Sequence, residues 1–146
     1  MRQVAIVVAT AGVGLLAGCG GGEEKESEAA PSKEAAAACN GSPLAESPKL
    51  PPSFPRIEAD KLTYTRQETK GATNIVEGYF HGDVGEANEE FEKELKGGGY
   101  AILFSELEEH DSEISWKGEG RTGQVAMREE CGDSDKTYVR ITNRPA

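Results

Sequence analysis

The sequence predicts an α+β domain in which one helix packs across a face of a curved antiparallel sheet. Between residues 56 and 146, several segments alternate apolar with polar residues, a period of two that is typical of strands buried on one face. One segment, residues 83–97, instead spaces its apolar residues by three and four, as an amphipathic helix does. Turn-forming residues separate these segments, so the expected order of elements is β-β-α-β-β-β-β.

A strand hairpin is expected to open the domain. Leu62 and Tyr64 alternate with polar residues in the first strand, and Lys70-Gly71 is typical of the turn that ends it. The second strand is expected within residues 73–80, whose larger apolar residues are Ile75, Val76, Tyr79 and Phe80.

The helix is the best-defined element in the sequence. Asp83 is expected to be its N-cap, with Glu86 three residues later completing a variant of the capping box. Gly97-Gly98-Gly99 predicts its end, since glycine easily adopts the left-handed conformation of a C-terminal cap. Because the helix is short and apolar on one side only, we expect it to lie on a sheet. The apolar side consists of Val84, Ala87, Phe91 and Leu95.

Four further strands are expected after the helix, separated by polar or glycine-rich turns. A domain of roughly 90 residues has a marginal core, so a covalent cross-link would add useful stability. The first of these strands covers residues 100–107, and the other three contain the alternating pairs Ile114/Trp116, Val125/Met127 and Val139/Ile141.

Residues 1–18 are expected to be a signal peptide that is removed on export. Arg2 is the only charge in the first 22 residues, and the apolar run over residues 4–17 is shorter than the about 20 residues needed to span a bilayer. The run ends in LAGC at residues 16–19, which resembles the lipobox of bacterial lipoproteins. This resemblance implies that Cys19 receives a diacylglyceryl group and anchors the mature protein to the cell membrane, facing outside the cytoplasm. An ordinary cleaved signal with a coincidental cysteine is the alternative.

Residues 19–55 are expected to form a flexible spacer between the lipid and the domain, which then covers residues 56–146. The spacer is rich in glycine, glutamate, alanine and proline and has almost nothing to bury, so ordering it would cost more than it returns. Glu34 to Ala38 has the composition of a helical turn but is too short to be stable alone. The proline-rich stretch near residues 49–55 would stiffen the spacer, and a partner-binding motif there is an alternative.

The other two cysteines, Cys39 and Cys131, form an even pair in a protein expected to reach an oxidising compartment. A disulfide between them would tie the spacer to the C-terminal part of the domain. Two unrelated thiols are the alternative, and a catalytic Cys131 is disfavoured because it has no basic neighbour in the sequence.

The charge of the chain limits its partners. With 26 acidic and 16 basic residues the formal net charge is −10, which argues against nucleic-acid binding because phosphate backbones attract a positive surface. Residues 118–123 match the dinucleotide motif G-x-G-x-x-G, but the residues that follow predict a strand where the motif requires a helix. The segment is therefore expected to be a hairpin loop, and no cofactor is expected.

The spacing of titratable residues predicts neither a catalytic set nor a metal site. His81, Asp83 and His110 are the candidates for a metal, yet no pair of them has a recognised ligand spacing. The acidic runs around residues 106–113 and 129–135 favour a solvated sheet edge over weak cation binding. Glycoside hydrolysis by paired carboxylates is disfavoured because the domain has few aromatic residues to line a sugar cleft.

Five short motifs lie between residues 50 and 142: LPPSFP at 50–55, GYFHGDV at 78–84, GY at 99–100, WKGEG at 116–120 and CG at 131–132. Together they resemble a group of small secreted proteins and lipoproteins of high-GC Gram-positive bacteria. The resemblance implies the same order of elements and carries over no catalytic or binding residue.

The function expected from these features is that of a lipid-anchored, non-enzymatic binding module whose partner is an envelope protein or a small ligand. The expected binding surface is the sheet face that the helix leaves open, with Tyr79, Trp116 and Tyr138 as candidate contact residues. Packing of these aromatic side chains in the core is the alternative. A passive, charge-bearing surface protein and an enzyme acting on an envelope substrate are the alternative functions.

Overall fold

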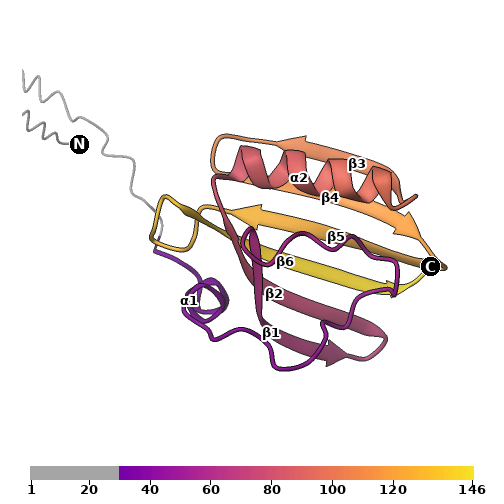
Figure 1. Cartoon of the computed structure of the whole chain (residues 1–146), viewed down its shortest axis with the longest axis horizontal. Helices are drawn as coiled ribbons and strands as arrows, with labels where there is room; N and C mark the ends of the chain where they lie inside the picture. Colours follow the sequence, from indigo (N-terminus) through magenta and orange to yellow (C-terminus); the bar gives the residue numbers. More distant parts are fainter. Residues whose placement is uncertain (1–29) are drawn as a thin grey trace, which may run out of the picture.

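The computed structural model describes residues 30–146, and Cys19 and the expected signal peptide lie outside this range. In the described range, six antiparallel strands form one sheet with a helix on each of its faces (Figure 1). Within the same range, no helix is long and apolar enough to span a membrane. The helices are α1 (Lys33–Cys39) and α2 (Val84–Gly97), and the strands are β1 (Leu62–Lys70), β2 (Thr73–His81), β3 (Ala101–Leu107), β4 (Asp111–Gly118), β5 (Arg121–Arg128) and β6 (Lys136–Pro145).

The last strand lies in the interior of the sheet, whose strand order is β1-β2-β6-β5-β4-β3. Helix α2 carries the chain from the end of β2 to β3 at the opposite edge. The chain then returns strand by strand until β6 pairs with β2, which places Val139 opposite Gly78 and Ile141 opposite Val76. The two edge strands are therefore β1 and β3.

Helix α2 begins at the predicted cap. Asp83 Oδ1 accepts a hydrogen bond from Glu86 N at 2.8 Å, and Glu86 Oε2 accepts one from Asp83 N at 3.2 Å, which completes the capping box. The apolar side of the helix is buried on β3, β4 and β5. The core beneath it includes Phe91, Leu95, Ile114, Trp116, Val125, Met127, Val139 and Ile141.

Replacing Asp83 with alanine is expected to lower the free energy of unfolding by about 1 kcal/mol, because the substitution removes the N-cap acceptor. Chemical denaturation of the variant and the wild type measures the difference. Asp60→Ala, at an exposed position before β1, is the control and is expected to change stability by less than about 0.5 kcal/mol. Equal losses in the two variants would contradict the assigned cap.

Residues 30–55 pack against the sheet, so the expectation of a flexible spacer is wrong for this segment. After α1 the segment crosses the sheet face that α2 also occupies, and Phe54 is buried against Trp116 with ring centroids 5.2 Å apart. Asn143 Nδ2 donates a hydrogen bond to Lys49 O at 3.0 Å, which fixes the segment beside β6. The folded domain therefore begins well before the expected boundary at residue 56.

Helix α1 is the element that the expected order omits. It lies on the face opposite α2, over β1, β2 and β6. Ser32 Oγ caps it by accepting a hydrogen bond from Ala35 N at 3.1 Å, and both Ala35 and Ala38 are buried against Tyr138. The order in the described residues is therefore α-β-β-α-β-β-β-β, with one helix more than expected.

The G-x-G-x-x-G segment forms the tight turn between β4 and β5, which confirms the expected hairpin. Glu119 and Gly120 have φ values of 50° and 69°, the left-handed conformation that a two-residue hairpin turn of this kind requires. Gly123 lies within β5, where a Cβ would collide with Thr142 O and with the Trp116 ring. Gly120 is therefore needed for the turn, and Gly123 is needed where the Trp116 ring and the backbone of β6 approach β5 closely.

Candidate interaction surface

Trp116 lies on the sheet face opposite the one where it was expected. It is two residues from Ile114 in β4 and therefore shares the face that α2 covers, where its side chain is fully buried. Phe54 and Tyr100 flank the indole ring, with ring centroids 5.2 and 5.4 Å away. Trp116 is a core residue, and its predicted role in binding is wrong.

Tyr138 lies on the expected face, but α1 covers it and leaves only 4% of it exposed. Its hydroxyl donates a hydrogen bond to Glu77 Oε1 at 2.6 Å. Glu77 is itself buried, and its carboxylate lies 3.2 Å from Arg66 Nη1 and 3.6 Å from Arg140 Nε. Two cations and a hydroxyl therefore compensate this buried carboxylate and connect β1, β2 and β6 beneath α1, and loss of one partner would leave a buried charge uncompensated.

Tyr79 is the candidate contact residue that remains partly exposed. Tyr79 in β2 is paired with Tyr138 in β6, so these two candidate residues are neighbours on the same face of the sheet. The Tyr79 ring lies nearly perpendicular to the His81 ring at 5.1 Å, and Lys136 Nζ lies 4.9 Å from the Tyr79 ring centroid. A partner approaching this face would meet one aromatic ring already in contact with a cation.

Burial raises the pKa of the Tyr138 phenol above its ordinary value of 10.0, and the hydrogen bond to Glu77 raises it further. The phenol ionises near pH 10 in the unfolded chain and stays neutral in the folded one, so the folded state loses stability only as the pH rises above 10. We expect Tyr138→Phe to reduce this alkaline loss by up to about 1.4 kcal/mol per pH unit. Free energies of unfolding measured on both sides of pH 10 would test this, and parallel curves for the two proteins above that pH would contradict it.

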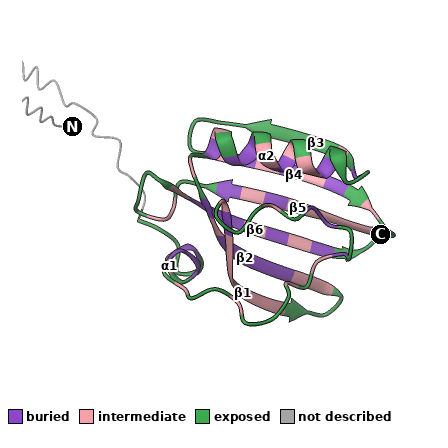
Figure 2. Cartoon of the chain, in the orientation of Figure 1, coloured by how far each residue is buried: buried purple, intermediate pink, exposed green. Residues whose placement is uncertain are grey.

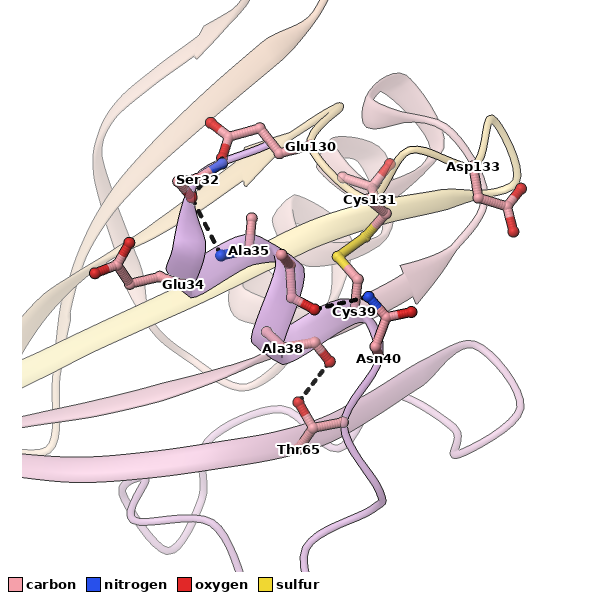
Figure 3. The surroundings of a disulfide bond; sticks show 12 residues. Ser32, Glu34, Ala35, Ala38, Cys39, Asn40, Thr65, Glu130, Cys131 and Asp133 are labelled. Atoms are coloured by element: carbon pink, nitrogen blue, oxygen red, sulfur yellow. Dashed lines mark hydrogen bonds between the residues drawn. A yellow bond between two sulfur atoms is a disulfide. The ribbon is translucent and has the colours of Figure 1, made fainter. Parts of the chain in front are cut away.

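The expected disulfide between Cys39 and Cys131 is present, with 5.4 Å between the two Cα atoms (Figure 3). It joins the last residue of α1 to the connection between β5 and β6. At the other end of the helix, Ser32 N and Ser32 Oγ donate to Glu130 Oε2 at 3.2 and 2.7 Å. Helix α1 is therefore fixed to the same connection at both of its ends.

The residues considered for a metal site do not form one. His81 lines two shallow hollows of about 340 and 400 Å³ near the start of α2, and the Glu86 carboxylate that also lines both is engaged in the capping box. His110 instead lies in the connection between β3 and β4, where its Nδ1 is 2.8 Å from Glu129 Oε2. Across residues 30–146, no three His, Cys, Asp or Glu side chains gather so that they could hold a metal ion.

Exposed apolar surface gathers on edge strand β3. Leu103, Phe104 and Leu107 are 60%, 50% and 52% exposed, and no other large hydrophobic residue in the described part of the chain is exposed. Figure 2 shows β3 exposed over most of its length, whereas β4 and β5 carry buried residues at alternate positions. A register shift between Ile102 and Phe104 marks a bulge, which re-aims side chains at this point of the strand.

Acidic residues continue from the exposed apolar residues of β3. In the register with β4, Glu106 lies directly opposite Glu113, and like charges in this position destabilise a strand pair. Glu113 lies 3.9 Å from Arg128 Nη2 and accepts a hydrogen bond from Gln124 Nε2 at 2.9 Å. Within the described residues neither Glu106 nor Glu108 forms an ion pair, and residues 101–116 contain no lysine or arginine. We refer to Leu103, Phe104 and Leu107 with Glu106, Glu108 and Glu113 as the β3 edge.

The β3 edge was not among the expected contact surfaces, although one signal for it exists in the sequence. Side chains of a strand alternate between its two faces, so the consecutive apolar residues Ile102, Leu103 and Phe104 cannot all face the core. Acidic residues follow them within two positions, which is typical of a strand at a sheet edge.

The chain matches no protein-family model, no curated protein and no solved structure.

Proposed function

We propose that this chain is an extracytoplasmic lipoprotein whose folded domain acts as a non-enzymatic binding module. The observation that carries the binding role is the exposure of three large apolar side chains, Leu103, Phe104 and Leu107, along the free edge strand of the sheet. Large apolar side chains exposed together are typical of surfaces that bind a partner. The remaining open face is less suited to binding, because α1 covers Tyr138 and a compensated ion cluster lies below it.

The disulfide supports a location outside the cytoplasm, because such bonds form and persist in oxidising compartments. Cys19 is the proposed lipid attachment site. A chain with a net charge of −10 is not attracted to anionic headgroups, so acyl chains on Cys19 would hold it at the membrane.

The anchoring is tested by membrane fractionation of Cys19→Ser. We expect the wild type to sediment with membranes and the variant to appear in the soluble fraction, because the variant lacks the thiol that accepts the lipid. A variant that remains fully membrane-bound would contradict the proposed anchor.

The binding role is tested by site-specific photo-cross-linking in intact cells. A photoreactive residue replaces Leu103 on β3 in one protein and Lys70 at the end of the opposite edge strand, β1, in the control; both positions are exposed. We expect a discrete cross-linked product from position 103 and none from position 70. The absence of a product at position 103 would contradict the binding role of this edge.

A further inference from the structure

We propose that the β3 edge binds an extended segment of a partner protein in which basic and apolar residues alternate, and that this segment joins the sheet as an additional strand. The inference rests on the binding role proposed above and names the chemistry of the partner.

The two edge strands of the sheet differ in whether another part of the chain lies along them. Along β1, Leu44 N donates to Tyr64 O at 2.8 Å, and Lys49 N donates to Gln67 Oε1 at 2.9 Å. In the described residues β3 pairs only with β4. An edge strand without a neighbour presents N–H and C=O groups that an incoming strand can pair with, and this is a recurring way of binding extended peptides.

The bulge places the pairing surface after residue 103. From Phe104 to Leu107 the register with β4 is regular, so side chains alternate between the two faces of the sheet. Phe104 and Glu106 face the side opposite α2, whereas Ser105 and Leu107 face the α2 side, where Ser105 Oγ donates to Glu92 Oε1 at 2.5 Å.

This alternation sets the composition of the partner segment. Its basic side chains would lie beside Glu106 in the adjacent strand and would offset the repulsion of this carboxylate by Glu113, which lies one strand further in. Their aliphatic stems would cover Phe104, and the apolar residues on the other face of the segment would pack against Leu107. The charge of the edge and the alternation of its side chains therefore favour a segment with one basic face and one apolar face.

A second copy of this chain is the less favoured occupant of the β3 edge. Each copy has a formal net charge of −10, so two copies repel each other as they approach. Within each copy, moreover, residues 101–116 supply no lysine or arginine to neutralise the acidic residues of the edge.

The test measures binding of a synthetic peptide of alternating lysine and valine to the purified full chain in detergent, by isothermal titration calorimetry. We expect affinity that falls as salt concentration rises, because exposed charges are screened. Methylating every backbone nitrogen of the peptide is expected to weaken binding by about tenfold or more, because the added strand can then donate no hydrogen bond. A peptide of alternating glutamate and valine is expected not to bind.

Protein variants separate the apolar and charged contributions. Phe104→Ser with Leu107→Ser is expected to weaken binding about tenfold through lost apolar contact. Glu106→Gln with Glu108→Gln is expected to weaken binding several-fold and to reduce its salt dependence. Glu46→Gln with Glu58→Gln removes the same charge at exposed positions outside the β3 edge and is expected to change affinity by less than about twofold. Circular dichroism checks that each variant is folded.

Three results would overturn the proposal: no binding of the lysine-valine peptide, equal affinity for its methylated form, or an equal loss in the control variant. A dimer of the wild type that dissociates into monomers in the Leu107→Lys variant, measured by sedimentation, would also overturn the proposal and would assign the β3 edge to a second copy. If the peptide fails while the cross-link at position 103 still forms, the proposed partner chemistry is wrong and the proposed binding function stands.

Discussion

Replacing Trp116 with alanine is expected to lower the free energy of unfolding by about 4 kcal/mol, because the substitution leaves a cavity in the core. The indole ring contacts both Phe54 and Tyr100, so its loss loosens the attachment of residues 50–55 as well as the packing beneath α2. Urea denaturation followed by circular dichroism measures the loss, since the only tryptophan is removed.

Two controls make this result specific to burial. Phe104→Ala removes an exposed aromatic ring and is expected to cost less than about 0.5 kcal/mol. Trp116→Phe keeps an aromatic ring in the same space and removes an indole N–H that makes no hydrogen bond within the described residues. We therefore expect it to lower the free energy of unfolding by less than half as much as Trp116→Ala does. A loss below about 1 kcal/mol for Trp116→Ala would show that Trp116 is not a core residue.

Removing the disulfide with Cys39→Ser and Cys131→Ser is expected to lower the free energy of unfolding by about 4 kcal/mol. The bond joins residues 92 apart in the sequence, and closing so long a loop restricts the unfolded chain strongly. It also holds the end of α1, a helix of 7 residues that is too short to be stable alone. We therefore expect α1 to become accessible to proteases at lower denaturant concentration than the sheet.

Reductant supplies the matched control for the disulfide. Reduced wild type is expected to have the stability of the double serine variant, and the variant itself should not respond to reductant. A wild type that is equally stable with and without reductant would contradict the role assigned to the bond.

Local signals were enough to predict helix α2 and the hairpins. The capping pair Asp83 and Glu86, the three glycines after the helix and the period-two alternation of the strands all act over a few residues. Because these signals lie within or next to each element, the strands and the helix from β1 to β6 occur in the expected order.

Helix α1 was not predicted because its stability comes from contacts distant in the sequence. An alanine-rich segment of this length does not form a stable helix by itself. Here Ala35 and Ala38 are buried on Tyr138, and Cys39 is bonded to Cys131. The same reasoning applies to Phe54, whose burial against Trp116 turns a proline-rich segment into part of the core.

The candidate surface was harder to predict than the fold, since it depends on the order of the strands. Trp116 was expected on the open face, although its alternation with Ile114 is a signal in the sequence that places it on the buried face. No local pattern specifies that β6 lies between β2 and β5, and this placement is what leaves β3 at the edge with Leu103 and Phe104 exposed.

The claim that the β3 edge accepts an additional strand is tested most directly by amide hydrogen exchange along β3 with and without the lysine-valine peptide. We predict that the outward-facing amides between Phe104 and Leu107 exchange more slowly when the peptide is bound, while those of β1 at the opposite edge are unchanged. Binding that leaves exchange in β3 unaltered, or that protects β1 instead, would contradict the claim.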